Sequence, residues 1–285
     1  MIELGENVYG KSRVRLLRVR REHGRHHLRE WTVELLLQGD FDSSFKDGDN
    51  SKILPTDTMK NTVYSLARTS SAESMEEFAK ELIDFILGRN PQVSNAEAGI
   101  SEKAWNRVVI GGEPHPTTFV QSSGELQTTK VARGRDGVFS VESGLENLIV
   151  MKTADSAFEG YIQDSLTTLA PTADRLLGTA LRASWKYKSA DADFEKLRTE
   201  IREILLAVFA GHRSKSVQHT LYAMGEGVLK NVAQVSEIKL TMPNIHCLLV
   251  DLSRFGQDNP NEIFVPIDEP HGTIEARLRR EEHSR

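Results

Sequence analysis

The sequence predicts an α+β protein made of two consecutive ββααββ units, each an antiparallel sheet with helices on one face. Both halves of the chain contain segments of alternating apolar residues and segments with apolar residues at helical spacing. The order of these segments is the same in each half. The 285 residues are about twice the usual domain length, so we expect one unit in residues 1–123 and another in residues 124–285.

Two strands joined by a turn open the first unit. Val14 to Val19 is rich in strand-forming residues that alternate with arginine. Glu30 to Gln38 has the two-residue period of a strand, and His23-Gly24-Arg25 predicts the turn between them. The apolar face of the second strand consists of Trp31, Val33, Leu35 and Leu37. Two later strands are predicted near Val93 to Ile110 and Thr117 to Gln121.

Two helices are predicted between these pairs of strands. Asp57 or Thr58 can cap the first helix. Ser70 and Glu73 have the spacing of a capping box for the second helix, and Asn90-Pro91 ends it. The apolar stripe of the second helix consists of Met75, Phe78, Ala79, Leu82, Ile83 and Ile86.

The second unit repeats this order. Its predicted strands are Gln127 to Ala132, Val138 to Met151, Gln234 to Met242 and Cys247 to Leu252. Helices are expected around Asp174 to Trp185, Phe194 to Ala210 and Val217 to Val232. Because four strands in each unit leave open sheet edges, we expect the sheet to close into a β-barrel when chains associate.

The composition excludes several classes of protein. A net charge of −5 is unfavourable for general nucleic-acid binding. No apolar run approaches the length of a membrane span, and the first residues lack the apolar stretch of a signal peptide. A single cysteine, Cys247, excludes an internal disulfide and a metal site of several cysteines. We therefore expect a cytoplasmic protein that binds neither nucleic acid nor membrane.

Two patterns resemble ligand sites but lack the required context. Gly5 to Ser12 fits the phosphate-loop pattern, yet only four residues precede it and the segment after it predicts a strand. His23, His26 and His27 cluster on a turn, without cysteine or carboxylate at metal-site spacing, so we expect no metal. The arginine-rich segment from Lys11 to Arg29 can bind anions, but a solvated strand face is the favoured interpretation.

Several polar residues lie at predicted helix starts and strand ends, where sites are commonly built. Lys11 precedes a strand, Arg175 lies early in a predicted helix, and Gln218 begins another helix. Asn244 and His246 lie between two predicted strands. Taken one at a time, such residues are more often caps or surface residues than site residues.

These positions belong to a series of short segments that follow one another over most of the chain. They are Tyr9-Gly10-Lys11, Asp49-Asn50-Ser51, Thr56 to Thr62, Gly112 to Pro116, Phe158 to Gly160, Thr167-Thr168-Leu169, Asp174-Arg175, Ser216-Val217-Gln218 and Pro243 to His246. In these segments the chain resembles the urate oxidase (uricase) family, which has the tunnelling fold. Ile245 and Glu159 depart from the family pattern, at positions without an assigned chemical role. His283-Ser284-Arg285 differs from the peroxisomal signal of eukaryotic members, which indicates a bacterial-type, cytoplasmic protein.

The resemblance implies a reaction and a set of substrate contacts. Urate, dioxygen and water give 5-hydroxyisourate and hydrogen peroxide, without a metal or organic cofactor. Phe158 stacks on urate, Arg175 offers a planar fork of donors to one edge, and Gln218 pairs with the opposite edge. The further contacts implied are Thr56, Asn244, the backbone amides of Asp57 and Val217, and the apolar walls Leu169 and Ile274.

The resemblance also implies catalytic residues and an assembly. Lys11 and Thr56 form the catalytic pair, and His246 assists the proton relay. Thr56 and Asn244 hold dioxygen or water. A lysine acts as a base only where burial and neighbouring groups lower its pKa. The implied assembly is a homotetramer with active sites at the subunit interface.

Two other functions stay open at this point. A metal-dependent pterin or GTP-ring enzyme of the same fold needs a zinc site, for which the chain offers no convincing ligands. A non-catalytic purine-binding protein would keep the pocket and dispense with Lys11 and Thr56. Zinc analysis tests the first, and loss of urate absorbance without added metal tests the second.

Overall fold

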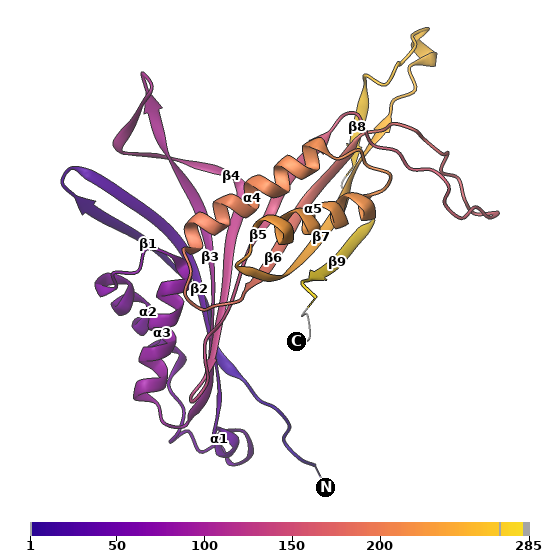
Figure 1. Ribbon diagram of the computed structural model, residues 1–285. Coiled ribbons are helices and arrows are strands. Elements are labelled where there is room, and N and C mark those ends of the chain that lie inside the picture. Colours follow the sequence, from indigo (N-terminus) through magenta and orange to yellow (C-terminus); the bar gives the residue numbers. More distant parts are fainter. Residues whose placement is uncertain (1, 268, 282–285) are drawn as a thin grey trace. The chain divides into compact units, whose positions relative to one another are not determined.

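The computed structural model describes residues 2–267 and 269–281, without the side chain of Ser123, and confirms the α+β class with antiparallel strands (Figure 1). The chain forms two compact units. Unit 1 comprises Met1–Leu145 and Lys186–Lys196, and unit 2 comprises Glu146–Trp185 and Leu197–Arg285. The division into repeats at residues 123 and 124 stays a prediction. The C-terminal residues compared with a peroxisomal signal lie outside the described residues.

Unit 1 contains an antiparallel sheet covered by helices. The strands are β1 (Tyr9–Glu22), β2 (Arg25–Gly39), β3 (Val93–Ile110), β4 (Glu113–Gly134) and the first part of β5 (Ser140–Lys152). The helices are α1 (Asp42–Asp47), α2 (Thr56–Thr69) and α3 (Met75–Arg89). Each strand from β1 to β4 pairs with its neighbour in sequence.

The core of unit 1 lies between this sheet and the two longer helices. The four apolar residues predicted for one face of β2 are all buried. Trp31 packs against Phe78 of α3 with ring centroids 5.1 Å apart. Figure 1 shows α2 and α3 next to one another beside these strands. The predicted period-2 strand and the predicted helical stripe therefore face each other in the core.

Unit 2 contains the rest of β5, most of β6 (Leu177–Tyr187) and most of α4 (Phe194–Gly211). It also contains α5 (Val217–Asn231), β7 (Val235–Leu249), β8 (Phe264–Ile267) and β9 (Thr273–Arg279). Strand β7 pairs first with β9, over Glu237 to Pro243, and then with β8, over His246 to Leu249. Helix α5 packs on β7 and β9, where a Cβ atom on Gly225 would lie 2.9 Å from Leu278 Cδ1.

The predicted helix from Asp174 to Trp185 is wrong. These residues form most of β6, and from Thr179 onward buried positions alternate with half-buried or exposed ones. Leu181, Ala183 and Trp185 are buried on one face. Alanine and leucine favour helices, but burial of alternate residues on a sheet outweighs that weak preference. Arg175 therefore lies in the segment before a strand, not early in a helix.

The predicted capping box is also wrong. The box is formed by Ser74 and Glu77: Ser74 Oγ accepts a 3.2 Å bond from the Glu77 amide, and the Glu77 carboxylate accepts one from the Ser74 amide. Ser70 instead ends α2, where its amide donates to the Leu66 carbonyl at 2.7 Å. Both pairs have the required spacing, and the pair that forms directly precedes the apolar stripe of α3.

Three predicted strand boundaries differ from the structure. Strand β7 continues through Pro243, so Asn244 and His246 lie within a strand, and Lys11 lies within β1. Strand β4 continues through the predicted junction at residues 122–124. Its ladder with β3 is irregular there, because Lys103 pairs with Leu126 while Trp105 pairs with Gln121. None of the helices in the described residues has both the length and the hydropathy needed to cross a bilayer.

Candidate active site

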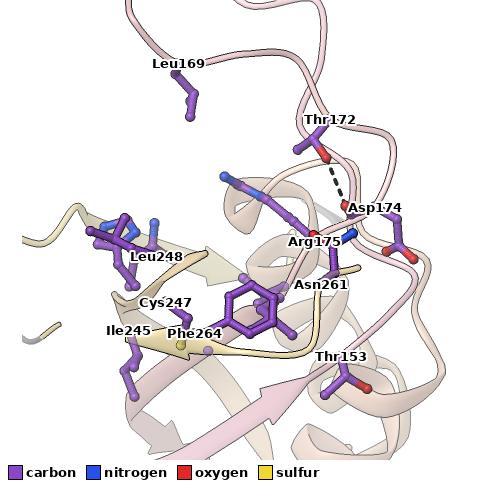
Figure 2. Close-up of a pocket in the computed structure, with 15 residues that line it drawn as sticks. Thr153, Leu169, Thr172, Asp174, Arg175, Ile245, Cys247, Leu248, Asn261 and Phe264 are labelled. Atoms are coloured by element: carbon purple, nitrogen blue, oxygen red, sulfur yellow. Dashed lines mark hydrogen bonds between the residues drawn. The ribbon is translucent and has the colours of Figure 1, made fainter. Parts of the chain in front are cut away.

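Unit 2 contains a cavity of about 420 Å³ beside the start of β6 and the second half of β7 (Figure 2). Its walls include four of the residues predicted for the site, which are Leu169, Arg175, Asn244 and His246. The residues that complete the lining are Thr153, Thr172, Asp174, Leu176, Leu177, Gly178, Ile245, Cys247, Leu248, Asn261 and Phe264. Figure 2 shows the Arg175 guanidinium extending into the space between Leu169 and Leu248.

The cavity lies where β7 changes its pairing partner. The Asn244 amide donates a 2.9 Å bond to the Gly272 carbonyl, just before β9 begins. Two residues later, His246 pairs with Ile267 of β8. The side chains at this change of partner therefore face a gap between two strands, which is the position of the cavity.

Backbone hydrogen bonds hold Arg175 and Phe158 together. The Arg175 amide donates to the Ser156 carbonyl at 2.7 Å, and the amides of Phe158 and Thr172 donate to each other's carbonyls at 2.8 and 3.1 Å. The Ser156 amide donates to Asp174 Oδ1 at 3.0 Å. As a result, Arg175 Cζ lies 4.9 Å from the centroid of the Phe158 ring. The structure thus brings the Phe158 ring, which is not among the residues that line the cavity, next to the guanidinium of Arg175, which is.

Two buried polar atoms at the cavity are without a hydrogen-bond partner among residues 2–267 and 269–281. They are the donor Arg175 Nε and the acceptor Asn244 Oδ1. Burial lowers the pKa of the Arg175 guanidinium, and the nearby Tyr161 opposes that change. An unpaired buried polar atom costs about 1–3 kcal/mol, which a ligand with a matching donor or acceptor relieves. The cavity therefore suits a planar polar molecule that both accepts and donates hydrogen bonds.

The N-terminus of α5 is tied to the same backbone network. The Ala157 amide donates to the Ser214 carbonyl at 2.8 Å, three residues before α5 begins. Ser216 caps the helix by accepting a bond from the His219 amide at 3.1 Å. Val217 is buried and Gln218 is exposed, and their amides occupy the first turn, where no intrahelical acceptor exists. These amides are suitable donors for a ligand.

Ile274 is not among the residues that line the cavity. It lies in β9 opposite Met242, and its Cδ1 would be 3.8 Å from a Cβ atom on Gly272. That hypothetical Cβ atom would also lie 3.6 Å from Asn244 Nδ2. Ile274 is therefore near Asn244 without contributing to the cavity wall.

Lys11, Thr56 and Asp57 form a second group in unit 1. The Tyr9 hydroxyl accepts a 2.9 Å bond from the Leu54 amide, which joins the start of β1 to the segment before α2. Lys11 and Thr56 are both half-buried. A Cβ atom on Gly10 would lie 1.9 Å from the Leu35 carbonyl oxygen, so only glycine fits beside Lys11.

The start of α2 has an open N-terminus and a local charge cluster. No side chain caps this helix, whereas serines cap α3 and α5. A hydrogen bond from Lys60 lowers the pKa of the Asp57 carboxyl, with further contributions from the charges of Lys60 and Lys11. The charge of Lys11 thus acts on the start of α2, and the first amides of α2 are available to a ligand.

Sequence reasoning missed several lining residues. Phe264 is the first residue of β8, a strand of four residues that was not predicted, and Asn261 lies shortly before that strand. Ile245 and Cys247 were assigned no role in the site, yet both line the cavity. Their contribution depends on strand β7 continuing past Pro243, which the sequence pattern did not indicate. In the described part of the chain, no three His, Cys, Asp or Glu side chains form a group that could hold a metal ion.

Comparisons with known proteins identify similar chains along nearly the full length. The profile of the uricase family matches residues 7–132 and 141–275. The uricase of Arthrobacter globiformis is 38% identical over 280 residues, covering 98% of this chain and 91% of that protein. The uricase of Arabidopsis thaliana is 40% identical over 294 residues, covering 95% of this chain and 94% of that protein.

Solved structures are also similar to this chain over nearly its full length. The crystal structure of uricase from Arthrobacter globiformis matches with a TM-score of 0.93 at 37% identity, covering 100% of this chain and 97% of that chain. The urate oxidase of Bacillus sp. TB-90 matches with a TM-score of 0.84 at 22% identity, covering 96% of this chain and 100% of that chain. The second match supports the fold alone.

Proposed function

The chain belongs to the uricase family and has urate oxidase activity, and we propose that it converts urate, dioxygen and water to 5-hydroxyisourate and hydrogen peroxide without a cofactor. The observation that carries this proposal is the family match over residues 7–132 and 141–275. The atoms balance, because urate loses two electrons, dioxygen gains two, and water supplies the new hydroxyl group. The family match does not favour a pterin or GTP-ring enzyme or a non-catalytic binding protein.

Urate binding is assigned to the cavity in unit 2. Phe158 stacks on the purine ring. The half-buried Arg175, whose Cζ lies 4.9 Å from the centroid of the Phe158 ring, binds one edge of the anion. Gln218 and the amide of Val217 bind the other edge, at the first turn of α5. Asp57 contributes a backbone amide from the first turn of α2, and Leu169 and Ile274 provide apolar contacts.

Proton transfer is assigned to Lys11, Thr56 and His246. Thr56 relays the proton of urate or water, Lys11 accepts it, and His246 assists the relay. Thr56 and Asn244 hold dioxygen or water above the purine ring. The buried Asn244 Oδ1, which accepts no bond from the described residues, supports the assignment of a water here. The electrons come from the urate anion, so no cofactor is required.

The stoichiometry of the reaction tests this function. Purified protein should consume one dioxygen and form one hydrogen peroxide for each urate, measured with an oxygen electrode and a peroxidase-coupled assay. A lower peroxide yield would indicate a different oxidation. Binding of urate without any oxygen uptake would support the purine-binding alternative and contradict the proposal.

The proposed assembly is a homotetramer whose sheets close into a barrel, with active sites between subunits. Two features support it. The β1 strand in unit 1 pairs on one side with β2, and the loop before β6 exposes Ile162, Leu166 and Leu169 to solvent. Apolar side chains of this kind are typical of surfaces that another chain covers. The expected cytoplasmic location stays a prediction.

Hybrid oligomers test whether the sites are shared. Lys11→Ala and Arg175→Ala chains, carrying different affinity tags, are co-expressed and purified through both tags. If each site takes Lys11 from one chain and Arg175 from another, some sites in a hybrid contain both groups and recover activity. Each variant alone should be inactive. Verified hybrids that stay as inactive as both parents would show that each site is built within one chain.

A further inference from the structure

Tyr161, which was not predicted for the site, connects three residues that are proposed to contact urate. Its ring stacks on the Phe158 ring, with centroids 4.8 Å apart and planes inclined by 13°. Its hydroxyl donates a 2.5 Å hydrogen bond to the Leu169 carbonyl. Its charge interaction with Arg175 opposes the effect of burial on the pKa of that guanidinium. Tyr161 therefore contacts the stacking residue and the apolar wall, and it influences the cation.

These contacts matter because the other hydrogen bonds described within the surrounding loop are local ones among Asp164, Leu166 and Thr167. The segment between Phe158 and Thr172 contains no helix or strand, and its two ends are joined by the reciprocal backbone bonds of those residues. Gly160 adopts a positive φ of 72°, which directs the chain away from an extended path. The bond from Tyr161 to Leu169 crosses the loop. It thereby limits the positions available to both the Phe158 ring and the Leu169 side chain.

We propose that Tyr161 is a positioning residue for urate, which fixes the plane of Phe158 and holds Leu169 at the cavity wall. The inference rests on the proposed role of Phe158 in stacking on urate. A flat substrate that packs on Phe158 therefore meets a ring whose orientation Tyr161 has already fixed. Binding to a ring whose orientation is already fixed loses less conformational entropy. Tyr161 takes no part in the proton transfer assigned to Lys11 and Thr56, so it affects the affinity for urate and not the turnover.

Anaerobic titration with urate tests this inference, because urate cannot react without dioxygen and the dissociation constant is read directly. Tyr161→Phe keeps the stack and removes the hydrogen bond, so urate should bind about 2- to 10-fold more weakly. Tyr161→Leu removes both contacts and should weaken binding about 5- to 150-fold. The value of kcat at saturating urate should stay within about twofold for both variants. Tyr222→Phe, at an exposed tyrosine of α5, is the matched control and should bind urate normally.

A double-mutant cycle with Phe158→Leu separates the inference from the function on which it rests. In the Phe158→Leu background, Tyr161→Leu should weaken urate binding by no more than the about 2- to 10-fold of the lost hydrogen bond to Leu169, because its partner ring is gone. Normal binding by Phe158→Leu alone would contradict the proposed stacking role. Weakened binding by Phe158→Leu with normal binding by both Tyr161 variants would overturn the positioning role of Tyr161. A fall in kcat without a change in affinity would also overturn it. Thermal melting shows whether each variant is folded, and Tyr161→Phe alone decides the hydrogen-bond part if Tyr161→Leu does not fold.

Discussion

Replacement of Arg175 by lysine should weaken urate binding although the charge is kept. Arg175 is half-buried, its Nε atom is a buried donor without a described partner, and its Cζ lies 4.9 Å from the Phe158 ring. A guanidinium offers several donors in one plane, parallel to the edge of a flat anion, whereas an ammonium offers a single point of charge. The substitution therefore removes at least one charge-assisted hydrogen bond, worth about 1.5–3 kcal/mol. That loss corresponds to about 10- to 150-fold in the dissociation constant.

The assay is anaerobic titration with urate, together with KM and kcat under air. Arg182→Lys is the matched control, because Arg182 lies on β6, close in sequence to Arg175, and its side chain is 64% exposed. The control should bind urate normally, and both variants should keep a melting temperature near that of the parent. Unchanged urate affinity in a folded Arg175→Lys protein would refute the assignment of Arg175 to urate.

Three further changes have defined outcomes. Cys247→Ala should keep most activity and lose less of it during turnover, because a half-buried thiol at the cavity is exposed to product peroxide; near-total loss of kcat in a folded variant would contradict this. Gly10→Ala should lower stability by about 1–3 kcal/mol or more and reduce activity, because the new Cβ atom would lie 1.9 Å from the Leu35 carbonyl oxygen; an unchanged melting temperature would contradict this. Burial, followed by the charges of His219 and Lys152, lowers the pKa of His212, so the unfolded chain takes up this proton more readily and stability falls as the pH drops through about 6.5. Between about pH 7.5 and about pH 5.5, the melting temperature of His212→Gln should therefore fall less than that of the parent. An equal fall would assign the acid sensitivity to other groups.

Local sequence patterns correctly predicted the helices and strands that bury only one face. Strand β2 and helices α3, α4 and α5 each have an apolar face with a clear period, and all four are present close to their predicted positions. Strand β6 was predicted as a helix, although Leu181, Ala183 and Trp185 alternate along it. Its alanine and leucine content suits both structures, and only packing in the sheet decides between them.

The candidate site could be predicted only in part. Arg175, Asn244 and His246 were assigned to the site through the resemblance to a family, and the structure places all three at one cavity. Physical reasoning on the sequence could not bring them together, because about 70 residues separate Arg175 from Asn244 and no local signal reports contacts of that range. Tyr161 was missed for the same reason. Its role depends on a hydrogen bond across an irregular loop, which no periodic pattern indicates.

The protein is proposed to catalyse the oxidation of urate by dioxygen without a metal or organic cofactor. The direct measurement is the rate of urate loss by protein that has been exhaustively treated with chelators, with metal content determined on the same sample. The chelator-treated protein should keep full activity at a metal content far below one ion per active site. Its activity should not increase when zinc, copper or iron is added. Loss of activity on chelation, with recovery on adding back one metal in proportion to its binding, would contradict the account.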